Sequence, residues 1–184
     1  MSTQSDAVRT LTYEEARFRI QNGDMITFRK NQSSSWWHYF TTWVMKSEYY
    51  HCGIAMWLQS NSGVKRLFIC EAGTKRRLIL LSVYKGLDFD VIACPVDFEL
   101  VEDSLLNRVG VAKYSFATYL AVGLRYLLGI SFEQQRGEIC SMLVQSEYRR
   151  AGLEALPEVV MSPGELHNWL LNHWNATLRF EVKG

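Results

Sequence analysis

The chain has 184 residues, of which 48% are apolar and 21% are charged; this balance excludes a disordered chain and suits one domain, residues 1–184, with a sizeable core. Its formal net charge of +1 excludes a strong electrostatic attraction to nucleic acid, so we expect no nucleic-acid partner. The four cysteines contain no CxxC pair, which argues against a disulfide framework.

No export signal or membrane span is readable in the chain. Residues 1–6 are polar and lack the basic and apolar regions of a secretory signal. The longest apolar-rich segment, Tyr114 to Leu128, is interrupted by Arg125 and is too short to cross a bilayer. We therefore expect a cytoplasmic protein without a transmembrane segment.

Helix and strand signals alternate along the first half of the chain. Thr12 and Glu15 form a capping box that predicts a helix ending at Asn22-Gly23. An aromatic-rich helix that packs widely or lines a cleft is predicted over residues 36–45. Strands are predicted over residues 25–28, 51–58, 67–70, 76–83 and 90–94.

The second half has mainly helical spacing. Helices are predicted over residues 98–113, 115–128 and 139–150, and Ser162 with Pro163 begins another. A last strand is predicted over residues 177–182. These elements predict an α+β fold in which an antiparallel sheet packs against helices.

The strand pair that begins at His51 places an imidazole beside a carboxylate. The midpoint of positions 51 and 71 falls in the turn residues 59–63, so we expect His51 to lie directly across from Glu71. The same register sets Ile54 opposite Phe68. A carboxylate beside an imidazole orients a general base.

Cys140 is the candidate nucleophile because it lies in the first turn of a predicted helix. The helix N-terminus favours thiolate over thiol, and its free N–H groups can hold an oxyanion. Gly53 and Ala55, on the predicted face of His51, are small enough for that helix to approach. From position alone, a buried structural cysteine is an equally good interpretation.

Five segments together resemble the permuted NlpC-type papain-like hydrolases, and most closely their YiiX-like group. In that group the histidine precedes a polar residue and the cysteine comes last, as here. The resemblance spans about residues 22 to 170 and implies a circularly permuted papain-like fold. The matching segments are Gly23-Asp24, Tyr50-His51-Cys52-Gly53-Ile54, Phe68-Ile69-Cys70-Glu71-Ala72, Lys113-Tyr114-Ser115-Phe116 and Cys140-Ser141.

The resemblance implies a thiol hydrolase that cleaves a peptide-type amide through an acyl-cysteine intermediate, without a cofactor. Cys140 would be the nucleophile, His51 the general base and Glu71 the group that orients the imidazole. Tyr114 would hold the oxyanion or the substrate, which could be a peptide, another amide or an acyl lipid. A lipid-directed acyltransferase or esterase on the same site and a non-catalytic binding or structural module are the alternatives, because one fold hosts several activities.

The remaining polar candidates carry weaker signals. His38, His167 and His173 have no identifiable partner carboxylate, although His38 could line the cleft. Cys52, Cys70 and Cys94 lie in apolar runs and are interpreted as buried. Strand alternation puts Cys52 and Cys70 on the face opposite His51, which argues against a zinc site. The basic residues 65–66 and 75–77 are interpreted as solvated turns, and the alternative is that they flank a cleft that receives an acidic substrate.

Overall fold

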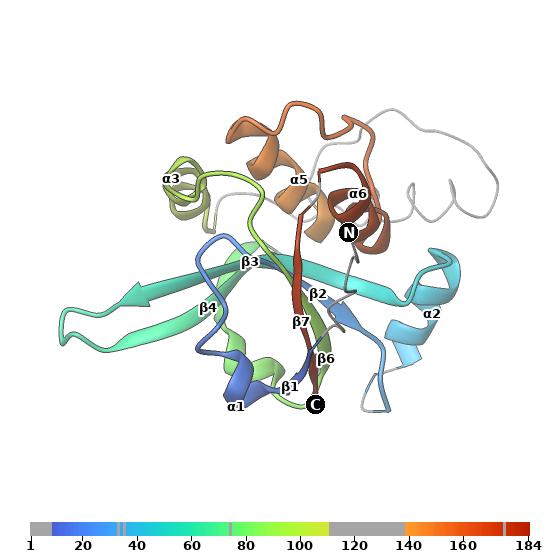
Figure 1. Ribbon diagram of the computed structural model, residues 1–184, viewed down its shortest axis with the longest axis horizontal. Coiled ribbons are helices and arrows are strands. Elements are labelled where there is room, and N and C mark those ends of the chain that lie inside the picture. Colours follow the sequence, from blue (N-terminus) through green and yellow to red (C-terminus); the bar gives the residue numbers. More distant parts are fainter. Residues whose placement is uncertain (1–8, 33, 35, 74, 111–138, 175) are drawn as a thin grey trace, which may run out of the picture.

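The computed structural model of the protein describes residues 9–32, 34, 36–73, 75–110, 139–174 and 176–184. Its centre is a seven-stranded sheet with the strand order β1-β7-β6-β2-β3-β4-β5 (Figure 1). Every pairing is antiparallel except that of β1 with β7. The strands are β1 (Thr10–Thr12), β2 (Met25–Arg29), β3 (Tyr49–Gln59), β4 (Lys65–Ala72), β5 (Arg76–Leu80), β6 (Asp88–Ile92) and β7 (Leu178–Lys183).

The helices lie on both sides of this sheet. Figure 1 shows α3, α5 and α6 over one face and α1 at the other. Within the described ranges, no helix has both the length and the apolar character needed to cross a membrane. The helices are α1 (Tyr13–Ala16), α2 (Trp36–Val44), α3 (Glu99–Asn107), α5 (Cys140–Arg150) and α6 (Pro163–His173), with a 3-10 helix η1 (Leu81–Tyr84).

Alternate strand residues face two separate apolar clusters, as a period of two requires. Ile54 and Met56 of β3 pack with the helical layer, whereas Ala55 belongs to the cluster on the opposite face. The prediction of an α+β fold with an antiparallel sheet packed against helices is therefore confirmed, apart from the parallel β1–β7 pair. The predicted helix over residues 115–128 lies outside the described residues.

The predicted element boundaries hold where a cap defines them. Ser162 accepts the Glu165 N–H and Glu165 caps the Ser162 N–H in return, so α6 begins as expected, with a proline in its first turn. Thr12 and Glu15 form the same box, but α1 ends at Ala16, well before Asn22-Gly23. The strand expected to reach position 83 ends at Leu80 and turns into η1.

The prediction that the helix of Cys140 packs on the face of Gly53 and Ala55 is wrong. α5 packs in the cluster that contains Cys52, Ile54 and Met56, and Ala55 faces away from it. A Cβ atom added at Gly53 would lie 2.6 Å from the Cys70 carbonyl oxygen and 2.7 Å from a side-chain carbon of Ile69. Gly53 therefore permits the close approach of β4, and α5 docks on the face that offers the larger apolar side chains.

Candidate active site

The hairpin of β3 and β4 is displaced by two residues from the predicted register. Ile54 pairs with Cys70, and the prediction that it would face Phe68 is wrong. The cause is a turn that lies one position later than predicted, at residues 60–64, which Ser60 closes by donating its N–H to the Val64 carbonyl at 3.0 Å. His51 and Glu71 are consequently diagonal neighbours and not directly opposed. A shift of two keeps both side chains on one face, because side-chain direction repeats every second residue.

The two strands separate beyond the Ile54–Cys70 pair. From there β3 follows β2 back to Tyr49, whereas β4 follows β5 to Ala72. This fork opens the sheet next to His51. Cys140, on the helical side of the sheet, thereby comes into hydrogen-bonding contact with His51, which projects from the other face.

A β-bulge at Tyr50 brings the Tyr50 ring to the same side of β3 as His51. Phe28 of β2 pairs with His51, but the next residue, Arg29, pairs with Tyr49, so Tyr50 is an extra residue in β3. Tyr50 and His51 consequently both lie against Phe28, with ring centroids 6.4 and 5.7 Å from its own. Bulges of this kind re-aim side chains next to active sites.

His51 and Glu71 make a short hydrogen bond, 2.7 Å between Nε2 and Oε2. The Glu71 side chain is fully buried. Arg77 holds its Oε1 through Nε at 2.9 Å and Nη2 at 2.7 Å, and the Tyr84 hydroxyl lies 2.8 Å from both carboxylate oxygens. Burial raises the pKa of Glu71, but hydrogen bonding to His51, Tyr84 and Arg77 outweighs it and lowers the pKa to about 2.

Arg77 and Tyr84 are site residues that the sequence analysis missed. Arg77 is the cross-strand partner of Glu71 in the β4–β5 ladder. The signal was available, since a short hairpin around Gly73 puts position 77 opposite position 71. Tyr84 carried no such signal, because it reaches the carboxylate from η1.

Cys140 is the first residue of α5 and lies where the helix meets the sheet. Ile139 precedes it with extended backbone and has no capping side chain, so a side-chain cap does not occupy the first-turn N–H groups. Hydrogen bonding from the Cys52 side chain, together with the charge and hydrogen bond of His51, lowers the pKa of Cys140 well below its ordinary value, although burial opposes this.

His51 is held in its charged form by its two partners. Burial lowers the pKa of His51, but the Cys140 thiolate and the Glu71 carboxylate outweigh burial and raise the pKa to about 10. Since Nε2 is bonded to Glu71, Nδ1 is left for proton exchange with Cys140. Both shifts favour a thiolate paired with an imidazolium, which is the form that a Cys–His nucleophile requires.

A pocket of about 250 Å³ opens onto this pair. Its wall includes His38 and Thr41 of α2, and the His38 ring stacks on Tyr50 with centroids 3.9 Å apart. Within the described part of the chain, the Nδ1 atom of His38 and the hydroxyl of Tyr50 are buried without a hydrogen-bond partner. The expectation that His38 lines the cleft is confirmed.

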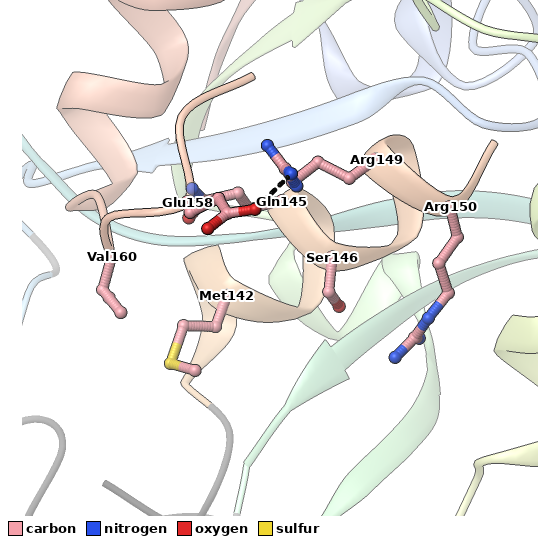
Figure 2. Close-up of a pocket in the computed structure, with 7 residues that line it drawn as sticks. All are labelled: Met142, Gln145, Ser146, Arg149, Arg150, Glu158 and Val160. Atoms are coloured by element: carbon pink, nitrogen blue, oxygen red, sulfur yellow. Dashed lines mark hydrogen bonds and ion pairs between the residues drawn. The ribbon is translucent and has the colours of Figure 1, made fainter. Parts of the chain in front are cut away.

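A second hollow, of about 390 Å³, lies on the outer side of α5 (Figure 2). Its charged groups are engaged with the protein itself: Arg149 pairs with Glu158 at 2.9 Å, and Arg150 with Glu147 at 2.8 Å. Gln145 donates to the Val159 carbonyl at 2.9 Å. The Arg149 and Gln145 contacts join α5 to residues 157–160, so this hollow lies at a structural contact of α5.

The other predicted candidates lie apart from the pocket. His167 lies on α6 and is buried, with Nε2 3.2 Å from the Tyr49 hydroxyl and 4.0 Å from an Asp90 carboxylate oxygen, a partner that strand or helix spacing did not identify. His173 is exposed and stacks on Trp169. Tyr114 lies outside the described residues. Arg76, which we expected in a solvated turn, is buried.

Among the described residues, no group of three or more His, Cys, Asp or Glu side chains could hold a metal ion. Cys52 and Cys70 lie on the helical face, opposite His51, as strand alternation predicts. Cys140 lies at the fork between the two faces, but the side chains of His51, Cys52, Cys70 and Cys140 do not form such a group.

Comparison with known proteins found likeness in solved structures and not in sequence families. No family model matches the chain, and no curated protein matches its sequence. Among solved structures, the chain is similar to the metalloprotein YiiX from Escherichia coli O157:H7, a DUF1105 protein. The two share 17% identity and a TM-score of 0.49 over 90% of this chain and 89% of that one.

The buried Glu71 carboxylate makes folding stability depend on pH. Its pKa of about 2 in the folded state lies below the ordinary value of 4.5, so the unfolded chain takes up the proton first as pH falls. The free energy of unfolding gains roughly 3 kcal/mol from this carboxylate. This stabilisation is fully present above about pH 4.5 and is lost as the pH falls towards 2. Denaturant unfolding of Glu71→Gln should lack this acid-range loss. The exposed Glu154→Gln should retain it; identical profiles for the two variants would contradict the assignment.

Proposed function

We propose that this protein is a thiol hydrolase that cleaves an amide bond through an acyl-Cys140 intermediate. One observation carries the proposal. Cys140, at the start of a helix, contacts His51, whose other ring nitrogen lies 2.7 Å from the buried Glu71 carboxylate. Nucleophile, base and orienting carboxylate are the three parts that nucleophilic acyl transfer requires.

In the proposed reaction, the Cys140 sulfur attacks the carbonyl carbon and forms a C–S bond. The oxyanion that develops would be held by first-turn N–H groups of α5. His51 gives its Nδ1 proton to the departing amine as the C–N bond breaks. It then takes a proton from a water molecule, whose oxygen attacks the thioester and releases the carboxylic acid. Glu71 keeps the ring oriented throughout and stabilises its charge.

The order of these residues supports a circularly permuted papain-like arrangement. We also propose that the protein is related to the YiiX-like group of such folds. The histidine strand comes first, the carboxylate strand second and the cysteine helix last. Tyr114 stays a predicted contact for the oxyanion or the substrate, to be tested by substitution. The proposed substrate is a peptide or another amide.

A lipid-directed acyltransferase or esterase is the second candidate, and α2 favours it. His38 and Thr41 of this helix line the pocket, while Trp36 and Trp43 are 75% and 67% exposed. Exposed tryptophans next to a site are typical of surfaces that contact acyl chains or membrane interfaces. Hydrolysis of short peptide amides compared with acyl esters in vesicles separates the two candidates.

Alkylation by iodoacetamide between pH 5 and pH 9 tests the site without a known substrate. We expect Cys140 to be modified faster than Cys52, Cys70 and Cys94 in the folded protein, with a midpoint well below pH 8.5 because the thiolate is stabilised. Mass spectrometry of tryptic peptides identifies the modified residue. A Cys140 that reacts no faster than the other three would support the non-catalytic module.

A further inference from the structure

Two thiols meet at the base of the pocket, and only one of them is open to it. Cys140 lines the pocket and is 9% exposed. Cys52 is fully buried behind it, in the same apolar cluster, and its side chain hydrogen bonds to that of Cys140. A small reagent that enters the pocket therefore meets Cys140 first and cannot reach Cys52 directly.

The two sulfurs also differ in protonation. The pKa of Cys140 is lowered by the Cys52 hydrogen bond and by His51, whereas burial raises the pKa of Cys52 well above its ordinary value. Oxidants attack thiolates and not thiols, so reactivity and access both select Cys140. Cys52 remains a protonated thiol in contact with it.

We propose that Cys52 is a resolving cysteine, which captures a peroxide-oxidised Cys140 as a reversible Cys52–Cys140 disulfide. The inference rests on the proposed role of Cys140 as the nucleophile, and it assigns that site a redox control. While the disulfide exists, no thiolate is available to attack a substrate. The same bond protects Cys140 from irreversible oxidation, since a sulfenic acid that meets a thiol condenses with it.

The chemistry balances with one molecule of hydrogen peroxide. The Cys140 thiolate attacks one peroxide oxygen and the O–O bond breaks, so that the sulfur becomes a sulfenic acid. The hydroxide that leaves takes the proton of the His51 imidazolium and is released as water. The Cys52 sulfur then attacks the Cys140 sulfur, the S–O bond breaks, and the hydroxide leaves with the Cys52 proton as a second water. Two thiols are oxidised to one disulfide, and the peroxide is reduced to two waters.

The remaining cysteines are differently placed. Cys94 donates its S–H to the Val96 carbonyl at 3.1 Å and packs against Gly23. Cys70 lies in the same cluster as Cys52, on β4, and is fully buried. It provides a matched control: a buried cysteine on the neighbouring strand and on the same face of the sheet.

The test treats the whole chain with hydrogen peroxide in buffer that contains a chelator. We expect wild type to lose two hydrogen atoms in mass and to yield a cross-link between the tryptic peptides 47–65 and 137–149. Dithiothreitol should restore the alkylation of Cys140 completely. Cys70→Ala should behave as wild type. Cys52→Ala should instead gain two or three oxygen atoms on Cys140, and dithiothreitol should not restore its alkylation.

The wild-type cross-link is mapped without any variant, so a Cys52→Ala chain that fails to fold does not prevent the test. A wild type that gains oxygen atoms in place of losing hydrogens overturns the inference, as does a cross-link to peptide 67–75, which contains Cys70. If Cys140 is selectively alkylated but forms no cross-link, the redox control fails and the hydrolase proposal stands. A Cys140 inert to both iodoacetamide and peroxide overturns both.

Discussion

His51→Gln is expected to slow the alkylation of Cys140 at pH 6 by about 100-fold, because the thiolate loses its charged partner. Glutamine can still hydrogen bond to Glu71 but cannot be protonated, so the pKa of Cys140 should return towards an ordinary cysteine value near 8.5. Stopped-flow or quenched reaction with iodoacetamide, followed by peptide mapping, measures the rate. Turnover of any amide substrate should fall further, by about 10²–10⁴-fold, since general acid–base catalysis is lost as well.

The control is His173→Gln, which changes an exposed histidine on α6 outside the pocket and should leave the rate unchanged. The pH profile adds a second readout. Wild type should lose activity above about pH 10, when the His51 imidazolium deprotonates. A His51→Gln protein that retained the wild-type alkylation profile would show that the imidazole does not activate Cys140.

Arg76→Met should be the most destabilising substitution outside the pocket, by about 3–5 kcal/mol. Arg76 and Glu147 are both fully buried side chains, with 2.8 Å between Nη1 and Oε1. Removing the guanidinium leaves the Glu147 carboxylate buried with its main partner gone. The pair also joins β5 to the α5 helix, so the same substitution should loosen the position of Cys140 and reduce its selective alkylation.

Arg150 contacts the same Glu147 oxygen at 2.8 Å, but its side chain is 44% exposed. Arg150→Met is therefore the matched control and should cost less than about 1 kcal/mol. Urea unfolding followed by tryptophan fluorescence gives both free energies. The double variant Arg76→Met/Glu147→Leu should recover much of the loss, because no unpaired charge remains buried. Equal losses for the two arginine variants would contradict the assigned burial.

The sequence by itself determined those features that depend on neighbours a few positions apart. Ser162 with Glu165 begins α6 because a capping box involves four consecutive residues. His51 and Glu71 share a face because side-chain direction along a strand repeats every two residues, and a register error of two preserves that relation. Cys140 lies at a helix start as predicted, because the helical spacing of residues 139–150 is also a local pattern.

Only the tertiary structure decided how these pieces meet. The Ser60–Val64 turn moved the hairpin register, and the bulge at Tyr50 brought the Tyr50 ring beside His51, through pairings that no local pattern specifies. The face on which α5 docks was decided by where the large apolar residues Ile54 and Met56 could be buried together. This docking placed Cys140 beside Cys52 and, through the fork between β3 and β4, in contact with His51. A local segment could not predict it, because burial depends on how the whole chain packs.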